Sequence, residues 1–198
     1  YGLARVGKTL PVTTLILAGV ALGALLGSIV SYLIISSGEK MHGIIFWLMG
    51  SLSLGAWRDL AVSVPLMVVG LVLLLLFRWR MNVLSMSDEE ARALGVNVRR
   101  EKVIVIGATT LITSAATAVA GIIGWVGLIV PHLVRLMVGA DNRKVIPLSA
   151  AAGASFLLIA DDITRGISPL EIPIGIFTSI IGIPLFIFLL KKTRKVWL

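Results

Sequence analysis

Two short segments of the chain have residue types that nucleotide hydrolases use. Near the start, four residues match the spacing G-x-x-x-x-G-K-[ST], namely Gly2, Gly7, Lys8 and Thr9. In such a loop, backbone amides and the lysine hold the phosphates of a nucleotide. Farther along, Phe156 to Asp162 is an apolar run that ends in two acids, like the strand that delivers a magnesium-binding aspartate. Whether these residues do phosphate chemistry depends on the elements that position them.

The composition points away from a soluble enzyme. Of the 198 residues, 58% are hydrophobic and 14% are charged, whereas soluble domains average about 45–50% apolar and about 25% charged residues. We therefore expect an all-α polytopic membrane protein whose surface faces lipid. The net charge of +8 does not indicate a nucleic-acid partner, because Lys and Arg accumulate in the cytoplasmic loops of membrane proteins. The absence of cysteine excludes disulfides and thiol chemistry.

Charge-free stretches predict six transmembrane helices in a single domain, residues 1–198. A hydrocarbon core about 30 Å thick is crossed by roughly 20 helical residues. The stretch Val103 to Val134 is too long for one crossing. Near its middle lie Gly121, Gly124 and Gly127, which indicate a tight turn between two helices. The predicted spans cover about residues 12–35, 60–77, 103–120, 123–138, 145–160 and 172–190.

The distribution of positive charges supports this topology. With six spans, all but three of the 18 Lys and Arg fall on one side, the exceptions being Lys40, Arg58 and Arg165. Because the cytoplasmic side carries the excess of Lys and Arg, both ends of this chain are predicted to be cytoplasmic. The segment Met41 to Trp57 is short and interrupted by Gly and Ser. Letting it cross would move a basic cluster to the wrong side, so we expect a partly inserted short helix there.

This topology disfavours nucleotide hydrolysis. A phosphate-binding loop needs a strand before it and a soluble helix after it. Here one residue precedes Gly2, and Pro11 and a membrane span follow Lys8. Asp161 and Asp162 would lie a full membrane away from Lys8. We therefore interpret the first segment as a basic cytoplasmic flank, with Pro11 suited to a helix start.

The first predicted span has glycines on one helix face. Gly19, Gly23 and Gly27 recur every four residues, which allows another helix to approach closely. We favour helix packing within the chain, and a subunit interface or a moving pathway wall is the alternative. No predicted span centre carries an acid or base, which disfavours an ion-coupled carrier. His132 has no further ligand at a useful spacing, so we expect neither a metal site nor a cofactor.

The predicted cytoplasmic loop of residues 81–100 contains a capped helix. Ser87 followed by Glu90 makes a capping box, and Gly95 suits a left-handed helix stop. The first turn carries acids, which suit the positive end of the helix dipole. These features predict a short surface helix from Asp88 to Leu94. Such a helix favours a docking element, and a solvated connector is the alternative.

The predicted outer loop, Asp161 to Gly175, is a second candidate site. It contains Arg165, one of the three outward positive charges, and Pro173, which can start the last span. A lone exposed arginine usually lies on a wet face without a specific role, so the residues alone leave the function of Arg165 open.

Five short motifs stand in a definite order along the chain. They are WLMGSLS (Trp47 to Ser53), EARALGV (Glu90 to Val96), GWVGLIVPHLVR (Gly124 to Arg135), LLIADD (residues 157–162) and EIPIG (Glu171 to Gly175). In this order and spacing they resemble the permease subunits of type II ATP-binding-cassette (ABC) importers, which move iron-siderophores, haem and cobalamin. Full-length members have further spans before the first one here. The chain, which begins without an initiator Met, is therefore expected to be the C-terminal portion of a larger helical permease.

The resemblance implies a set of partners. These are a second permease copy in a homodimer, two cytoplasmic ABC ATPase subunits and an extracytoplasmic substrate-binding protein, all at the lipid bilayer of a cell inner membrane. ATP would be hydrolysed by the partner, so this chain would have no catalytic residues. Trp47 to Ser53 would form a partly inserted helix near the outer gate, and Val12 to Ile35 and Ile172 to Leu190 would lie near the pathway.

The resemblance also implies two sites. Arg165 would pair with an acid on the binding protein. The capped helix would be a cytoplasmic coupling helix that docks on the ATPase and transmits its closure to the membrane helices. This ATPase-coupling site would comprise Ser87, Asp88, Glu89, Glu90, Arg92 and Gly95.

Two other functions remain open from the residues. Half of an ion-coupled secondary carrier would transport in response to an ion gradient and ignore ATP. A membrane scaffold without transport would use its glycine faces for assembly alone. Neither needs a capped cytoplasmic docking helix, so we expect a permease subunit whose alternating access is driven by partner ATPases.

Overall fold

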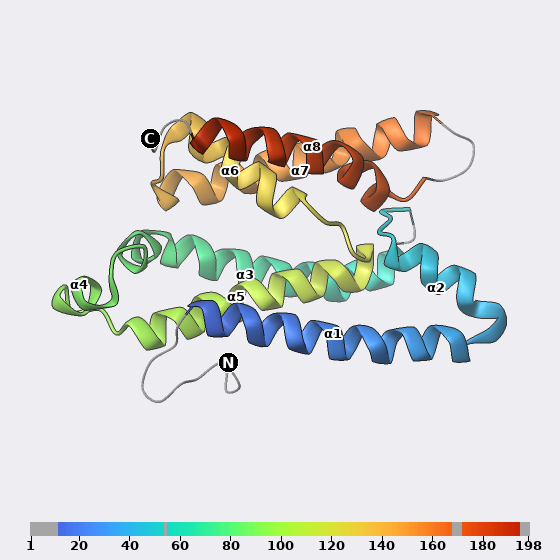
Figure 1. Cartoon of the computed structure of the whole chain (residues 1–198), viewed down its shortest axis with the longest axis horizontal. Coiled ribbons are helices and arrows are strands. Elements are labelled where there is room, and N and C mark those ends of the chain that lie inside the picture. Colours follow the sequence, from blue (N-terminus) through green and yellow to red (C-terminus); the bar gives the residue numbers. More distant parts are fainter. Residues whose placement is uncertain (1–11, 54, 168–171, 195–198) are drawn as a thin grey trace. The chain divides into compact units, whose positions relative to one another are not determined.

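The computed structural model describes residues 12–53, 55–167 and 172–194, and every regular element within them is a helix (Figure 1). The predicted all-helical fold is thus confirmed, while the segment Gly2 to Thr9 and Pro11 lie outside the described residues. The chain forms two compact units, Tyr1–Ile45 and Phe46–Leu198. The elements are α1 (Val12–Ser36), a 3-10 helix (Gly38–Lys40), α2 (Met41–Leu48), α3 (Trp57–Leu84), α4 (Asp88–Ala93), α5 (Val98–Ala120), α6 (Val126–Val138), α7 (Asn142–Ile167) and α8 (Ile174–Arg194).

Four of the described helices are long and apolar enough to cross a membrane. They are α3, α5, α7 and the part of α1 from Ile16 to Ser36. At the other two predicted spans the apolar helices are shorter, Val126–Val138 and Ile174–Leu189. At a rise of about 1.5 Å per residue, α6 extends roughly 20 Å, less than a hydrocarbon core of about 30 Å. The count of six spans therefore stays a prediction.

The predicted break in the stretch Val103 to Val134 is present. α5 ends at Ala120, and α6 begins at Val126, three residues later than predicted. Gly121 and Trp125 both have a φ of 68°. A right-handed helix cannot continue through such conformations, and a side chain such as that of Trp125 rarely adopts them.

The first unit consists mainly of α1, whose side chains are largely exposed. An added Cβ at Gly19, Gly23 or Gly27 would meet nothing within 4 Å. The glycine face is therefore open in this unit considered by itself. Which helix packs on it stays a prediction.

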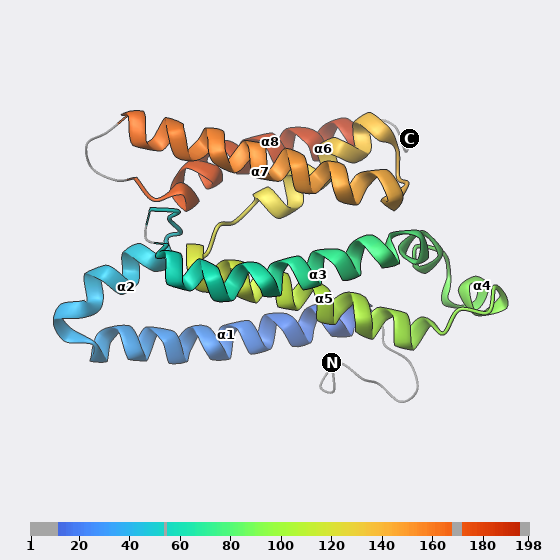
Figure 2. The ribbon, with the colours of Figure 1, turned by 180° about the vertical axis from the view of Figure 1, so that it is seen from behind.

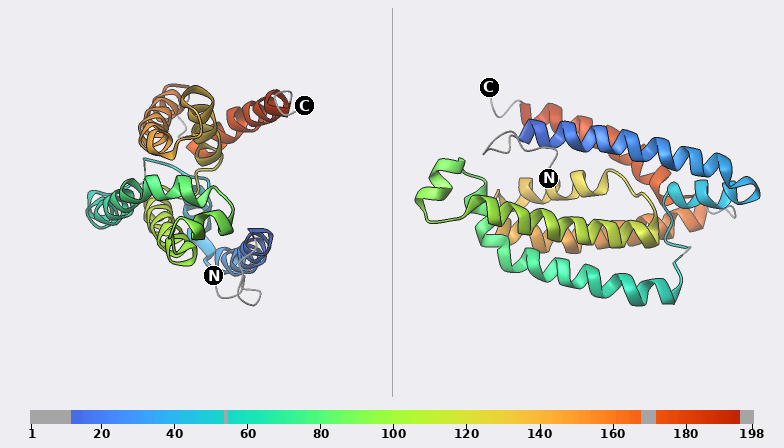
Figure 3. Two further views of the ribbon diagram at one scale, coloured as in Figure 1. Left: turned by 90° about the vertical axis from the view of Figure 1, so that its left-hand side faces the viewer. Right: turned by 90° about the horizontal axis from the view of Figure 1, so that it is seen from below.

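In the second unit, α3 and α5 run side by side, and α4 lies beyond their shared end (Figures 1 and 3). Small residues allow this close approach. A Cβ on Gly70 would lie 3.0 Å from the Ala108 carbonyl oxygen and 2.5 Å from Ile112 Cγ1. Helices in lipid associate through such van der Waals packing, because the surrounding lipid is as apolar as the side chains.

The remaining helices of the second unit form another group. α7 contacts α6, α8 and also α3, and α8 contacts α6 (Figure 2). Val130, Val134 and Val145 form a small core that joins α6 to the first turn of α7. The rings of Trp125 and Phe186 join the start of α6 to α8, with centroids 5.9 Å apart. The two groups meet through α3 and α7.

The structure corrects the predicted outer loop. α7 continues to Ile167, so Asp161, Asp162 and Arg165 lie in helix and not in a loop that begins at Asp161. The Arg165 Nε donates to Asp161 Oδ2 at 2.8 Å, and an ion pair four residues apart stabilises a helix. Residues 168–171 lie outside the described part, and Pro173 directly precedes α8, as expected.

Candidate functional site

The capping box predicted for residues 81–100 is present at the start of α4. The Glu90 backbone N–H donates to Ser87 Oγ at 3.3 Å, and the Ser87 N–H donates to Glu90 Oε2 at 3.0 Å. The Ser87 backbone amide, and after it the Ser87 hydroxyl, lower the pKa of Glu90. Gly95 ends the helix with a φ of 78°, the left-handed stop that was predicted. We call Ser87 to Gly95 the capped segment.

One side of the capped segment is seated on α3 and α5. Ala91 is 1% exposed and packs in a core with Val83 of α3 and Val98 of α5. Lys102 Nζ lies 2.8 Å from Asp88 Oδ1, so an ion pair adds a second connection to α5. A six-residue helix is not stable alone in water. Its caps and this seat therefore hold α4 in one position.

The other side of the capped segment is exposed and mixed in character. Asp88, Glu89 and Arg92 are exposed. Two large apolar side chains flank them, because Met86 is 53% and Leu94 is 63% exposed. Exposed large apolar residues beside charged ones are found at protein interaction surfaces.

An ion pair with one buried partner joins α3 to α5 near the capped segment. Arg80 of α3 pairs with Glu101 of α5, which is 3% exposed. The Glu101 Oε2 is buried and accepts no hydrogen bond. The Arg80 guanidinium also lies 5.4 Å from the centre of the Phe77 ring. Because Arg80 is its ion-pair partner, the buried carboxylate of Glu101 depends on α3 keeping its position against α5.

A second polar contact joins the end of α3 to the start of α7. The Asn82 Nδ2 donates to Asp141 Oδ1 at 2.7 Å, and the Asn142 backbone N–H donates to Asn82 Oδ1 at 2.8 Å. The Asn82 amide, and after it the Arg143 backbone amide, lower the pKa of Asp141. We call these contacts between Asn82, Asp141 and Asn142 the asparagine clasp.

Sequence reasoning missed the clasp and the buried ion pair. Polar residues at helix ends were visible, and Asp141 stands where a helix cap belongs. Their partners were not, because Asn82 and Asp141 are 59 residues apart in the chain. The predicted site residues Ser87 and Glu90 are brought together, and Asp88 gains Lys102 as a partner. Arg165 lies at the opposite end of α7, about 35 Å from Asn142 along the helix.

Arg165 is partly exposed and has a partner on its own helix. Its side chain is 52% exposed, whereas that of Asp161 is 15% exposed. The arginine is therefore not the lone residue that the sequence suggested, although half of its side chain faces outward from the unit.

The model of the FecCD transport family matches residues 1–192. The chain belongs to this family. The cobalamin import system permease protein BtuC of Halobacterium salinarum is 43% identical over 191 residues, which cover 96% of this chain and 52% of that protein. The hemin transport system permease protein HmuU of Yersinia pestis is 41% identical over 183 residues, which cover 91% of this chain and 55% of that protein.

A solved structure extends the comparison to the fold of this FecCD chain. It is described as an inward-facing conformation of a metal-chelate type ABC transporter, and it matches with a TM-score of 0.87 and 38% identity over 92% of this chain and 61% of that one. The chain spans about half the length of the curated relatives it matches. Membership in FecCD makes it a multi-pass membrane protein of the permease class, whose members are not themselves enzymes.

The end of the second unit opposite α4 is built from backbone contacts. A Cβ on Gly121 would lie 1.9 Å from the Trp47 carbonyl oxygen, and one on Gly175 would lie 2.1 Å from the Met49 carbonyl oxygen. A Cβ on Gly50 would lie 2.7 Å from the carbonyl oxygen of Ile122. We call the contacts of Gly50, Gly121 and Gly175 the glycine junction. It brings the end of α2, the α5–α6 break and the start of α8 together without side chains between them.

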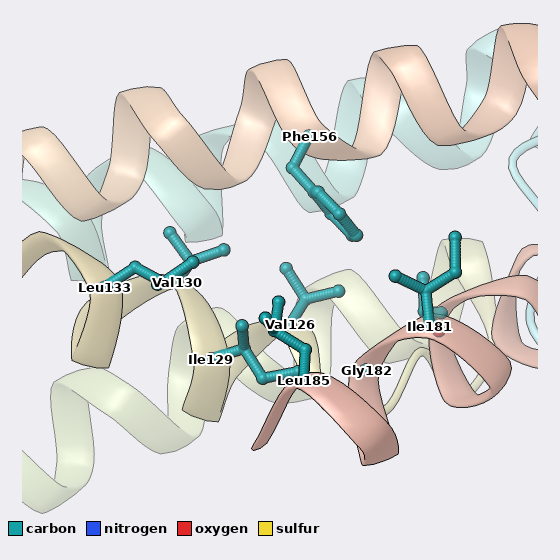
Figure 4. A pocket seen from close by; sticks show the side chains of 9 residues that line it. Val126, Ile129, Val130, Leu133, Phe156, Ile181, Gly182 and Leu185 are labelled. Carbon is teal, nitrogen blue, oxygen red and sulfur yellow. The ribbon is translucent and has the colours of Figure 1, made fainter. Parts of the chain in front are cut away.

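One cavity of the second unit is apolar and small. It measures about 40 Å³ and lies between α6, α7 and α8, with Phe156, Val130 and Ile181 on its walls (Figure 4). A void of this size with no polar lining holds no large ligand and offers water no partners. Among the described residues, no three His, Cys, Asp or Glu gather as a metal site.

Proposed function

We propose that this chain is the C-terminal portion of a permease subunit in an ATP-driven importer. The observation that carries the proposal is the capped segment, a helix held rigidly at the end of a membrane-helix pair with an exposed, mixed apolar and charged outer side. FecCD membership supports it, and so does the likeness to a metal-chelate type ABC transporter. In this proposal, the capped segment docks on a cytoplasmic ATPase, and a second permease copy and an outer binding protein complete the importer.

The mechanism follows from the rigidity of the docking element. ATP-driven approach of two ATPase subunits would displace both capped segments, and α3 and α5 would move with them because Val83, Ala91 and Val98 share one core. Alternating access is then a change in packing between helices, with the energy supplied by contacts that differ in the two states. Both ends of the chain lie in the cytoplasm in this proposal, and the residues from Ile174 onward flank the pathway.

The proposed substrates are iron-siderophores, haem or corrinoids. The names of the relatives support this range and widen it. They include a hemin permease, an Fe(3+)-citrate permease, a cobalamin permease and a molybdate permease. The small apolar cavity of the second unit is no substrate site. In this proposal, a large chelate would pass between subunits.

The docking proposal is tested by a charge change on the exposed side of α4. Arg92→Glu leaves the capping box in place, and Arg78→Glu makes the same change on an exposed residue of α3 outside the capped segment. We expect Arg92→Glu to reduce both the recovery of ATPase with the full-length permease and substrate uptake, and Arg78→Glu to preserve them. Equal recovery and uptake for the two variants would contradict the coupling role. Failure of the wild-type permease to recover any ATPase would contradict the importer.

A second part of the proposal is that Arg165 docks the binding protein. Arg165→Glu should weaken the complex in a salt-dependent way, because opposite charges across an interface attract less as salt screens them. Asp161→Asn breaks the same intrahelical ion pair but keeps the arginine charge, so it should preserve binding. Equal losses in the two variants would assign the effect to the helix end and not to the charge.

A further inference from the structure

The asparagine clasp connects the end of α3, a few residues before the capped segment, to the start of α7. Asn82 lies in the last turn of α3, next to Val83, which is part of the core under Ala91. The Ser85 backbone N–H donates to the Asn82 carbonyl oxygen at 3.2 Å, so the chain from Asn82 into the capped segment continues in hydrogen-bonded turns. A displacement of α4 would therefore also displace Asn82.

On the other side of the clasp, Asp141 caps the start of α7. Its carboxylate accepts the Arg143 N–H at 2.9 Å, and its carbonyl oxygen accepts the Lys144 and Val145 N–H groups at 3.0 Å. Val145 is 3% exposed and packs on Val130 and Val134 of α6. Movement of Asp141 therefore moves the start of α7 and the end of α6 together.

Both groups of the Asn82 side chain are used in this connection. The amide N–H₂ meets a carboxylate, and the amide oxygen meets a backbone N–H at the start of a helix, where the dipole is positive. α3 also packs along α7, but apolar packing resists separation more than it resists sliding. Two directional hydrogen bonds fix the register of the two helices, since such bonds weaken steeply when misaligned.

We propose that Asn82 is a positioning residue for transport, which makes the capped segment and the start of α7 move as one body. α7 carries this movement toward its far end, where Arg165 lies. The inference rests on the proposed function, because it assigns the route from an ATPase on α4 to the second group of helices. Without the clasp, α4 would move α3 and α5, and α7 would lag behind.

The charge pattern of the clasp provides a rescue test. Asn82→Asp places a second carboxylate against Asp141 and removes the donor between them. Combining it with Asp141→Asn exchanges the two groups. The new amide at position 141 can donate to the new carboxylate at position 82, which still accepts the Asn142 N–H. Because Asp141 Oδ1 accepts both the Asn82 N–H₂ and the Arg143 N–H in the wild type, the new amide must turn so that its N–H₂ faces position 82 and its oxygen faces the Arg143 N–H.

The experiment uses the full-length permease assembled with its ATPase and binding protein in proteoliposomes. We measure ATPase recovery, ATP hydrolysis and uptake of the transported chelate. Asn82→Asp should lower uptake per ATP about tenfold, within the range of 5- to 150-fold typical of coupling between sites, while ATPase recovery stays normal. The double exchange should restore uptake per ATP to within about twofold of wild type. Ser85→Ala, which removes an exposed hydroxyl that donates to the Met81 carbonyl oxygen, serves as the neutral control.

Two results would overturn the inference. One is wild-type uptake per ATP in Asn82→Asp, and the other is a double exchange that is as impaired as the single variant. If Asn82→Asp does not accumulate, the smaller and uncharged Asn82→Ser replaces it in the comparison with wild type. Absence of ATPase from the wild-type assembly is a different outcome, which contradicts the proposed function itself.

Discussion

The two ends of the second unit are held together by different chemistry. At the α4 end, side chains make the connections, through the Arg80 and Glu101 ion pair, the asparagine clasp and the capping box. At the opposite end, the glycine junction brings carbonyl oxygens against Cα atoms with no side chains between. Directional side-chain contacts hold two helices in one register, whereas the close backbone contacts of the junction leave no room for a Cβ. The α4 end is thus suited to transmit movement and the junction to fix where helices meet.

The largest expected effect is at the glycine junction. Gly121→Ala introduces a Cβ that would lie 1.9 Å from the Trp47 carbonyl oxygen, at a φ of 68°. Left-handed strain and overpacking together should cost about 3 kcal/mol or more of stability. The measurement is thermal unfolding of the purified full-length permease in detergent.

Gly107→Ala is the matched control for this prediction. Gly107 lies inside α5, and a Cβ there would meet nothing within 4 Å. Alanine should stabilise the helix by roughly 0.5–1 kcal/mol, because glycine loses more conformational entropy on folding. Equal unfolding temperatures for the two variants would contradict the claim that Gly121 is more tightly packed than the rest of α5.

The second-largest effect is expected at the ion pair between Arg80 and Glu101, at the α4 end. Arg80→Ala leaves the buried Glu101 carboxylate without its ion-pair partner. Removing one partner of a fully buried pair costs about 3–5 kcal/mol, and because the Arg80 side chain is 51% exposed we expect roughly 1–3 kcal/mol. Lys102→Ala breaks the more exposed pair with Asp88 and should cost less than about 1 kcal/mol. The same unfolding assay checks both, and equal losses would contradict a special role for burial.

A smaller and local effect is expected at the helix cap. Ser87→Ala removes the hydroxyl that accepts the Glu90 N–H, and loss of such a cap costs about 1 kcal/mol. The amides of α4 should exchange hydrogen faster, because a short helix depends on its caps. Ser85→Ala lies two residues away and outside the capping box, so it should leave exchange in α4 unchanged. Unaltered exchange in Ser87→Ala would assign the rigidity of α4 to its core alone.

The smallest effect concerns pH and the clasp. Hydrogen bonds from Asn82 and from the Arg143 amide lower the pKa of Asp141 in the folded protein. A carboxyl with a lowered folded-state pKa stabilises the fold above its unfolded-state pKa, and this stabilisation is lost as the pH falls through the folded-state pKa. The difference in unfolding temperature between wild type and Asn82→Ala should therefore be full at neutral pH and shrink in acid. A difference that is constant down to pH 3 would contradict the role of the ionised carboxylate.

Much of the fold followed from local patterns in the sequence. Long charge-free stretches marked the helices, because lipid leaves the backbone few other ways to satisfy its hydrogen bonds. The glycine cluster around Gly121 marked the break after α5, and Ser87, Glu90 and Gly95 marked the short helix between α3 and α5. These signals act within a few residues, so they can be read without knowing the partners.

One expectation failed and another stayed open, because both depend on contacts that the local sequence does not show. The outer loop was expected from Asp161, because charges there end the apolar stretch, yet the ion pair of Asp161 with Arg165 continues the helix. The small face of Gly19, Gly23 and Gly27 predicted close packing, but its partner helix cannot be read from the face itself. Charged residues mark where a chain leaves the hydrocarbon core, but the helix itself can continue beyond that point.

By itself, the sequence determined that this protein is a helical membrane protein, that α5 ends at a glycine cluster and how α4 is capped, because these properties arise from residues close together in the chain. Tertiary structure alone decided that Asn82 meets Asp141, that Arg80 meets Glu101 and that Gly121 lies against Trp47. These pairs are far apart in sequence, and each depends on the register in which two helices pack. The sequence therefore indicated which segments could act, and packing decided which of their residues meet.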